Sequence, residues 1–244
     1  LSLGTSWKQA RFQWQSIAAS TAEFAYQAFG GALSIINTSF LGQSTLAPGV
    51  GITSYPYQKF LTQNGLGVYI NGHWSSSTNL KSYVGTQANL GRDGFYYSCK
   101  FGIPAYDGTG KAFIGLSSST STPTNVNPLT LTNVLGIAKG VSDNTFHFVA
   151  SGSVATSYSL GIVINTTHAY QLIINGSNGL GEGVYLTLID LTDQTGVTYL
   201  VVGTQGTDFP GASTALYHRA WIATSGSATD QELAISNINL EFNK

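Results

Sequence analysis

The chain has 244 residues, of which 42% are hydrophobic, so it is long enough to bury a sizeable core. Only 9% of the residues are charged, against about 25% in a typical globular protein, and the net charge is −1. The ten basic residues are scattered, which argues against nucleic-acid binding through clustered phosphate contacts. A surface made polar by Ser, Thr, Asn, Gln and Gly suits contact with neutral sugars or close packing in an assembly.

The cysteine content and the apolar runs bear on the compartment of the protein. The single cysteine, Cys99, allows no intrachain disulfide and lies in a strand-like stretch, where we expect a buried thiol. This is consistent with assembly in a reducing bacterial cytoplasm. No apolar run approaches the ~18 residues of a membrane helix and no signal peptide opens the chain, so membrane insertion is not expected.

The first element in chain order is a possible short helix near residues 18–29, rich in Ala, Gln and aromatic residues and ended by Gly30-Gly31. The other elements are short β-type runs separated by turn residues. The predicted strands cover residues 95–101, 112–116, 145–149, 169–174, 184–190, 197–202 and 233–242. In the last run the apolar phase changes near Asn237, as it does at a β-bulge.

This spacing predicts an all-β fold, an antiparallel β-sandwich or jelly roll. We expect one domain over residues 1–244, with a possible subdivision near 75–92 between N-terminal strands (1–75) and a sandwich core (92–244). Within it, Gly115 and Gly136 lie inside apolar strands, where glycine permits a bulge or the close approach of another backbone. The glycines from Gly176 to Gly183 predict a glycine-rich hairpin.

An ordered set of motifs in the middle of the chain resembles a known family. The motifs are Gly94-Phe-Tyr-Tyr, Phe101-Gly102, Ala112-Phe-Ile-Gly-Leu116, the loop Ser119–Pro128, Leu131-Thr-Asn-Val-Leu-Gly-Ile137 and Ser142-Asp-Asn-Thr-Phe146. The set is similar to that of phage-encoded sandwich proteins found among tail-fibre and other virion structural genes. The match covers roughly residues 94–148 and is looser toward Leu216–Trp221 and Leu240–Phe242. Residues 1 to about 90 are similar to the family only in their general character.

The resemblance implies a place in a virion assembled in the host bacterial cytoplasm. It also implies contact with other virion proteins and a homo-oligomer, most often a trimer. A host surface polysaccharide is the ligand that such an appendage would contact.

Motifs for catalysis or cofactor binding are not found, so no catalytic residue, metal or cofactor is predicted. Gly108-Thr-Gly-Lys111 is no phosphate loop, and the four histidines lack metal-ligand spacing. His147, in an alternating strand, is interpreted as a hydrogen-bonded structural residue. The acidic candidates for glycoside hydrolysis all sit in turn-like contexts typical of structural Asp; they are Asp93, Asp107, Asp190, Asp193 and Asp208.

Aromatic residues in turn-like surroundings are the candidates for ligand binding. They are Tyr55, Tyr57, His73 and Trp74, beside polar neighbours. The alternative is that these rings fill the core or a subunit interface.

The sequence therefore predicts a non-enzymatic phage virion protein, of tail-fibre or appendage type, that attaches to a host cell-surface glycan. Two alternatives stay open: a purely structural virion protein, such as a capsid decoration or fibre scaffold, and a glycan-degrading enzyme.

Overall fold

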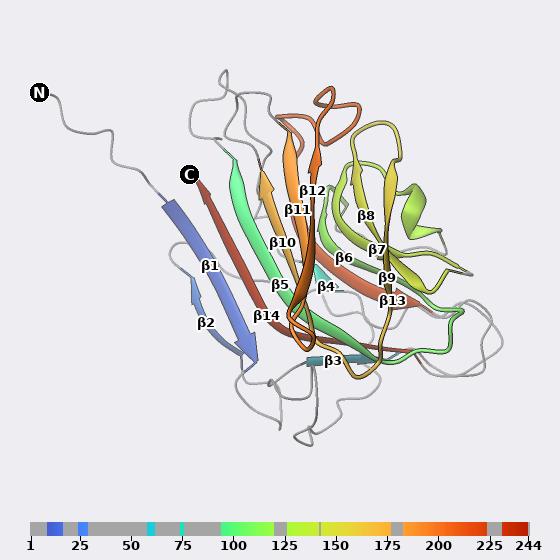
Figure 1. Cartoon of the computed structure of the whole chain (residues 1–244). Coiled ribbons are helices and arrows are strands. Elements are labelled where there is room, and N and C mark those ends of the chain that lie inside the picture. Colours follow the sequence, from blue (N-terminus) through green and yellow to red (C-terminus); the bar gives the residue numbers. More distant parts are fainter. Residues whose placement is uncertain are drawn as a thin grey trace, which may run out of the picture.

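The computed structural model describes residues 9–16, 24–28, 58–61, 74–75, 94–119, 126–141, 143–176, 183–223 and 231–243. These segments are nearly all β, and two antiparallel sheets pack face to face as a sandwich, which confirms the predicted fold class (Figure 1). A short 3-10 turn, η2 (Pro128–Thr130), precedes one strand. Within the described segments no helix is long and apolar enough to cross a membrane.

The larger sheet has eight strands in the order β12-β11-β10-β5-β14-β1-β2, and β3 lies beside β14. The first and the last strand are neighbours in this sheet, because β1 pairs antiparallel with β14 (Figure 1). Its strands are β1 (Gln9–Ser16), β2 (Phe24–Ala28), β3 (Gln58–Leu61), β5 (Phe95–Ala105), β10 (Tyr170–Gly176), β11 (Val184–Asp190), β12 (Thr195–Val201) and β14 (Glu232–Asn243).

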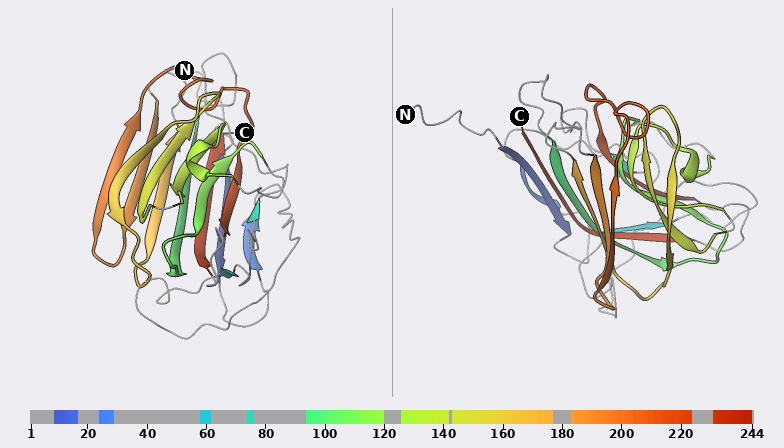
Figure 2. Two further views of the ribbon diagram at one scale, coloured as in Figure 1. Left: turned by 90° about the vertical axis from the view of Figure 1, so that its right-hand side faces the viewer. Right: turned by 45° about the horizontal axis from the view of Figure 1, so that its top comes forward.

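The smaller sheet has six strands in the order β4-β13-β6-β7-β8-β9 and faces the larger one (Figure 2). Its strands are β4 (Trp74–Ser75), β6 (Lys111–Ser117), β7 (Val134–Lys139), β8 (Thr145–Ser151), β9 (Ser157–Val163) and β13 (Tyr217–Ala223). At one edge Tyr158 of β9 packs on Tyr199 of β12, with ring centroids 4.4 Å apart, so the two sheets meet there.

The core lies between the inner faces of the two sheets. In β11 the burial alternates: Val184, Leu186 and Leu188 are fully buried, as the period-two pattern predicts for a strand with one apolar face. Cys99 of β5 is fully buried, which confirms the expected thiol, and burial raises its pKa to about 12. The outer face of the smaller sheet is also apolar: Phe113 and Trp221 are buried there in a second cluster.

The predicted helix near residues 18–29 is wrong for its second half. Residues Phe24–Ala28 form β2, paired antiparallel with β1 from Phe12↔Ala28 to Ser16↔Phe24. Pairing with a neighbouring strand satisfies the backbone of this stretch and overrides its modest helix propensity. The rest of that stretch, and most of the boundary expected near residues 75–92, lies outside the described residues, so the subdivision stays a prediction.

Two local predictions are confirmed. The ladder between β14 and β5 shifts register between Ile235 and Asn237, the position expected for a bulge. Gly115 and Gly136 lie directly opposite each other in the β6–β7 ladder. Strand β9, with one exposed and one half-buried face, was not predicted, although Tyr158, Leu160 and Ile162 alternate with small or exposed residues.

Replacing Gly136 with alanine tests the close approach of β6 and β7. A Cβ at this position would lie 2.4 Å from the carbonyl oxygen of Ile114, inside any real contact distance. We expect Gly136→Ala to lower the free energy of unfolding by about 1–3 kcal/mol in urea, as overpacking does. Gly211→Ala is the control, because the atoms nearest its Cβ would be the Thr214 hydroxyl at 3.3 Å and Cα of Gly206 at 3.7 Å. Equal stability of the two variants would contradict the argument.

Candidate functional site

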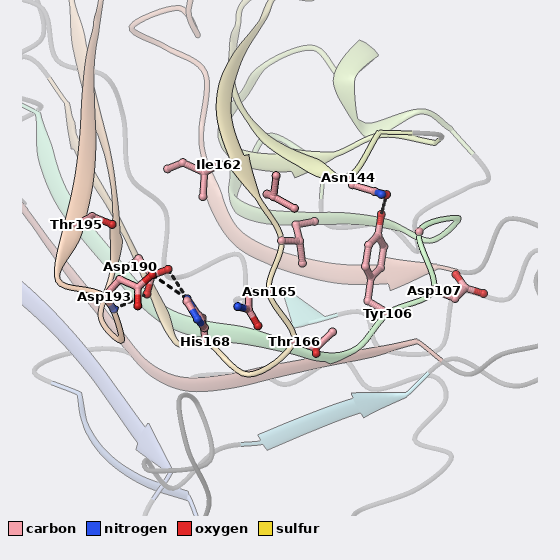
Figure 3. A pocket seen from close by; sticks show the side chains of 13 residues that line it. Tyr106, Asp107, Asn144, Ile162, Asn165, Thr166, His168, Asp190, Asp193 and Thr195 are labelled. Carbon is pink, nitrogen blue, oxygen red and sulfur yellow. Dashed lines mark hydrogen bonds and ion pairs between the residues drawn. The ribbon is translucent and has the colours of Figure 1, made fainter.

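An open cleft of about 710 Å³ lies at one end of the sandwich, a volume in the range of small-molecule sites (Figure 3). Four connections line it, namely those between β5 and β6, β7 and β8, β9 and β10, and β11 and β12. The antiparallel registers place all four at the same end of the two sheets. His168, Asp190 and Asp193 lie on one side of the cleft and Tyr106 and Asn144 on the other (Figure 3).

Each of the four connections contains an Asp or Asn two residues before a Thr. The side-chain oxygen accepts a hydrogen bond from the backbone N–H of that Thr, and in three of the four also from its hydroxyl. These turns therefore hold their own shape beyond the ends of the sheet ladders. The pairs are Asp107 with Thr109 (N···O 3.0 Å), Asp143 with Thr145 (2.8 Å), Asn165 with Thr167 (3.0 Å) and Asp190 with Thr192 (2.9 Å).

Aromatic residues of the core hold the connection between β9 and β10 in place. The hydroxyl of Tyr170 accepts a hydrogen bond from the N–H of Asn165 at 2.9 Å. The Tyr170 ring packs on Phe101 and Phe146, with centroids 5.6 and 5.0 Å away. The N–H of Ile164 donates to the carbonyl of Asn144 at 2.9 Å and so ties this connection to the turn between β7 and β8. The connection between β9 and β10, which lines the middle of the cleft, is therefore held in place by buried aromatic residues and by a backbone hydrogen bond.

Lys139, at the end of β7, fixes the wall formed by the connection between β5 and β6. Its ammonium donates to the carbonyl of Gly108 at 2.9 Å and to that of Gly110, and lies 4.7 Å from the centre of the Tyr106 ring. The side chain is only 1% exposed. Burial lowers the pKa of Lys139 to about 8, and the nearby carboxylates of Asp143 and Asp107 limit the fall.

Asp143 supplies a fixed negative charge next to Lys139. Partial burial alone would raise the pKa of Asp143, but hydrogen bonds from Thr145 and His147 lower it to about 2. His147 hydrogen bonds to the second oxygen of this carboxylate through Nε2. The expectation that His147 is a hydrogen-bonded structural residue is therefore confirmed.

One group of side chains in the cleft has metal-ligand chemistry. Ligand atoms of His168, Asp190 and Asp193 all lie within 4.8 Å of one another. In the structure Nδ1 of His168 donates to Asp190 at 2.7 Å and lies 3.8 Å from the carboxylate of Asp193. The three groups could hold a divalent cation, but their own hydrogen bonds already explain how they are arranged. Sequence spacing did not predict this group, because His168 and Asp190 are on different connections.

The aromatic candidates from the sequence do not provide the described lining of this cleft. Tyr55, Tyr57 and His73 lie outside the described residues, and Trp74 lies in β4, opposite Ala220 of β13. Their role in binding stays a prediction. Asp107, Asp190 and Asp193, interpreted from the sequence as turn residues, do form or adjoin turns and also line the cleft. The repeated Asx-x-Thr pattern is the sequence signal that could have brought these connections together.

Comparison with known protein families and with curated protein sequences gives no match. Solved structures similar to the chain include peanut lectin, with a TM-score of 0.62 and 7% identity over 96% of this chain and 97% of the lectin. Lectin I from Ulex europaeus, in complex with the methyl glycoside of α-L-fucose, has a TM-score of 0.59 and 9% identity over 96% and 97%. A protein of unknown function from Shewanella oneidensis MR-1 has a TM-score of 0.56 and 13% identity over 99% and 90%.

These similarities establish the fold: the sandwich is of the legume-lectin type. At such low identity they carry no residue roles to this chain. The phage resemblance rests on the sequence motifs alone.

Replacing Lys139 with methionine tests its burial under the cleft wall. Because the pKa is about 8 in the folded protein and 10.5 without burial, the unfolded chain binds more protons than the native state between these values. The free energy of unfolding should therefore gain up to about 1.4 kcal/mol per pH unit from this residue as the pH rises above 8. We expect this component to be absent from Lys139→Met.

The measurement is urea unfolding of both proteins from pH 7 to 9.5. Titration of the tyrosines in the unfolded chain is common to both proteins and cancels in the difference between them. The difference in stability between wild type and variant should change with pH. Parallel stability curves would show that Lys139 is not buried as described.

Proposed function

We propose that the protein is a non-enzymatic glycan-binding domain and that the cleft is its binding site. The observation that carries this proposal is the lining of the cleft. The half-buried ring of Tyr106 stands beside carboxylate, amide and hydroxyl groups from Asp107, Asn144 and Thr166. A sugar presents an apolar ring face and many hydroxyls, so an aromatic ring with hydrogen-bonding neighbours matches both parts.

The lectin-type fold supports the proposal. Among the similar structures, one lectin is described in complex with a fucose glycoside and another, lectin UEA-II, in complex with galactose. These ligands belong to those proteins, but they show that sugar sites occur on sandwiches of this type. The low charge of the chain fits a neutral, hydroxyl-rich ligand as well.

A hydrolytic function is less well supported. Asp107 and Asp190 each commit one carboxylate oxygen to a local turn, and the second oxygen of Asp190 accepts from His168. Retaining and inverting glycosidases need an acid and a second carboxylate on either side of the scissile bond. Groups held in turns by their own backbone are poorly placed to exchange protons with a substrate.

The narrower proposal is that this binding serves a phage appendage on a host cell-surface glycan, with a trimer as the assembly. Its support is the motif resemblance in residues 94–148. A purely structural role in the virion is the competing proposal; it would be favoured if no glycan bound. Sedimentation of the purified protein would decide the oligomeric state, and a stable monomer would contradict the trimer.

Substitution of Tyr106 tests the cleft as a glycan site. Purified protein is applied to an array of bacterial and plant glycans, and the best ligand is then titrated by calorimetry. We expect Tyr106→Ala to weaken binding about tenfold or more, which is about 1.4 kcal/mol, because the ring that packs on the sugar is lost. Tyr106→Phe keeps the ring and should bind within a few-fold of wild type.

Tyr185→Ala is the matched control, because Tyr185 is 43% exposed at the opposite end of β11 from the cleft. It should leave binding unchanged. Equal loss in both alanine variants, or no binding to any glycan, would overturn the proposal. Release of reducing sugar in the same samples would establish hydrolysis instead.

A further inference from the structure

The ionisable side chains that line the cleft are mostly acidic. Three of its lining residues are acidic, Asp107, Asp190 and Asp193. The lining that the structure describes includes no Lys or Arg, and its basic group is His168, which lies beside Asp190 and Asp193. Lys139, which donates to the carbonyl of the lining residue Gly108, is buried behind the wall, with Asp143 and Asp107 as nearby negative charges. A ligand in the cleft therefore faces a negative surface.

The three carboxylates differ in how much of their charge a ligand would feel. Asp190 is 6% exposed, and its oxygens accept hydrogen bonds from Thr192, Asp193 and His168. The side chain of Asp193 is 60% exposed, and its carboxylate lies 3.8 Å from His168, beyond hydrogen-bond distance. Asp107 is exposed on the opposite wall. Asp193 is thus the carboxylate best placed to meet a ligand.

We infer that the cleft selects glycans by charge and favours amino sugars with a free, protonated amine over their N-acetylated and anionic counterparts. The inference rests on the proposed function, because it concerns the ligand of the same cleft. A protonated amine is a compact cation with several N–H donors, which Asp193 can accept directly. N-acetylation removes the charge, whereas a uronic acid brings a like charge into the cleft and is repelled.

The test compares glucosamine tetrasaccharide with its N-acetylated form, which differs only in the charge and bulk of the amino substituents. Cellotetraose serves as the neutral ligand and a galacturonate tetrasaccharide as the anionic one. Calorimetry at pH 6.5 and low salt should show the free-amine ligand binding about tenfold tighter than the N-acetylated one. The galacturonate should bind more weakly than cellotetraose. The preference should shrink at high salt, because exposed charges are screened.

Asp193→Asn should lower the preference for the free amine, measured as the ratio of the free-amine to the N-acetylated affinity, to about threefold or less. Glu241→Gln is the matched control, because it removes one negative charge on β14, outside the lining of the cleft. It should leave the preference intact.

The outcomes separate this inference from the function on which it rests. Equal binding of the free-amine and N-acetylated ligands, or of galacturonate and cellotetraose, would overturn charge selection while glycan binding stands. A preference that survives in Asp193→Asn, or falls equally in Glu241→Gln, would show that the cleft is not its source and would overturn the inference too. If no tetrasaccharide binds and the glycan array is also negative, both proposals fail together.

Discussion

The cleft depends on one local hydrogen-bond pattern, in which an Asp or Asn side chain accepts from a Thr two residues later. It occurs in all four connections that meet there, at Asp107, Asp143, Asn165 and Asp190. Strand ladders end at this edge of the sandwich, so the backbone beyond them must find other partners. Turns that satisfy themselves can hold a fixed concave surface without a covering element.

Two layers of charge follow from this arrangement. Below the surface, Lys139 lies among carbonyl oxygens and near Asp143, so its buried charge is balanced where it sits. At the surface, Asp193 reaches solvent from the turn between β11 and β12. The buried layer fixes the shape of the walls, while the exposed layer is left to meet a ligand. Different residues therefore hold the walls in shape and contact the ligand, so a substitution can change the charge that a ligand meets without changing the walls.

The sequence predicts the sandwich well and its cleft poorly, for a physical reason. Alternation of apolar residues is a local signal, and it located β11 and the bulge near Asn237. The glycine pair Gly115 and Gly136 also showed locally that two backbones come close. The cleft, in contrast, is lined by residues between 106 and 195 that come together only when the strands pair in the right register. A local sequence pattern does not show that register. Helix propensity near Phe24 misled because pairing with β1 was not visible in the sequence.

The scarcity of charge gives weight to the acidic lining. The chain has eleven acidic residues in 244, and three of them line one cleft. On a highly charged protein such a group would be one patch among many. Here the net charge is −1, so the protein as a whole exerts little long-range attraction on cationic polymers. Any preference for a cationic sugar must then arise at short range, within about a Debye length of these carboxylates. This places the selectivity in the cleft and not in the overall charge.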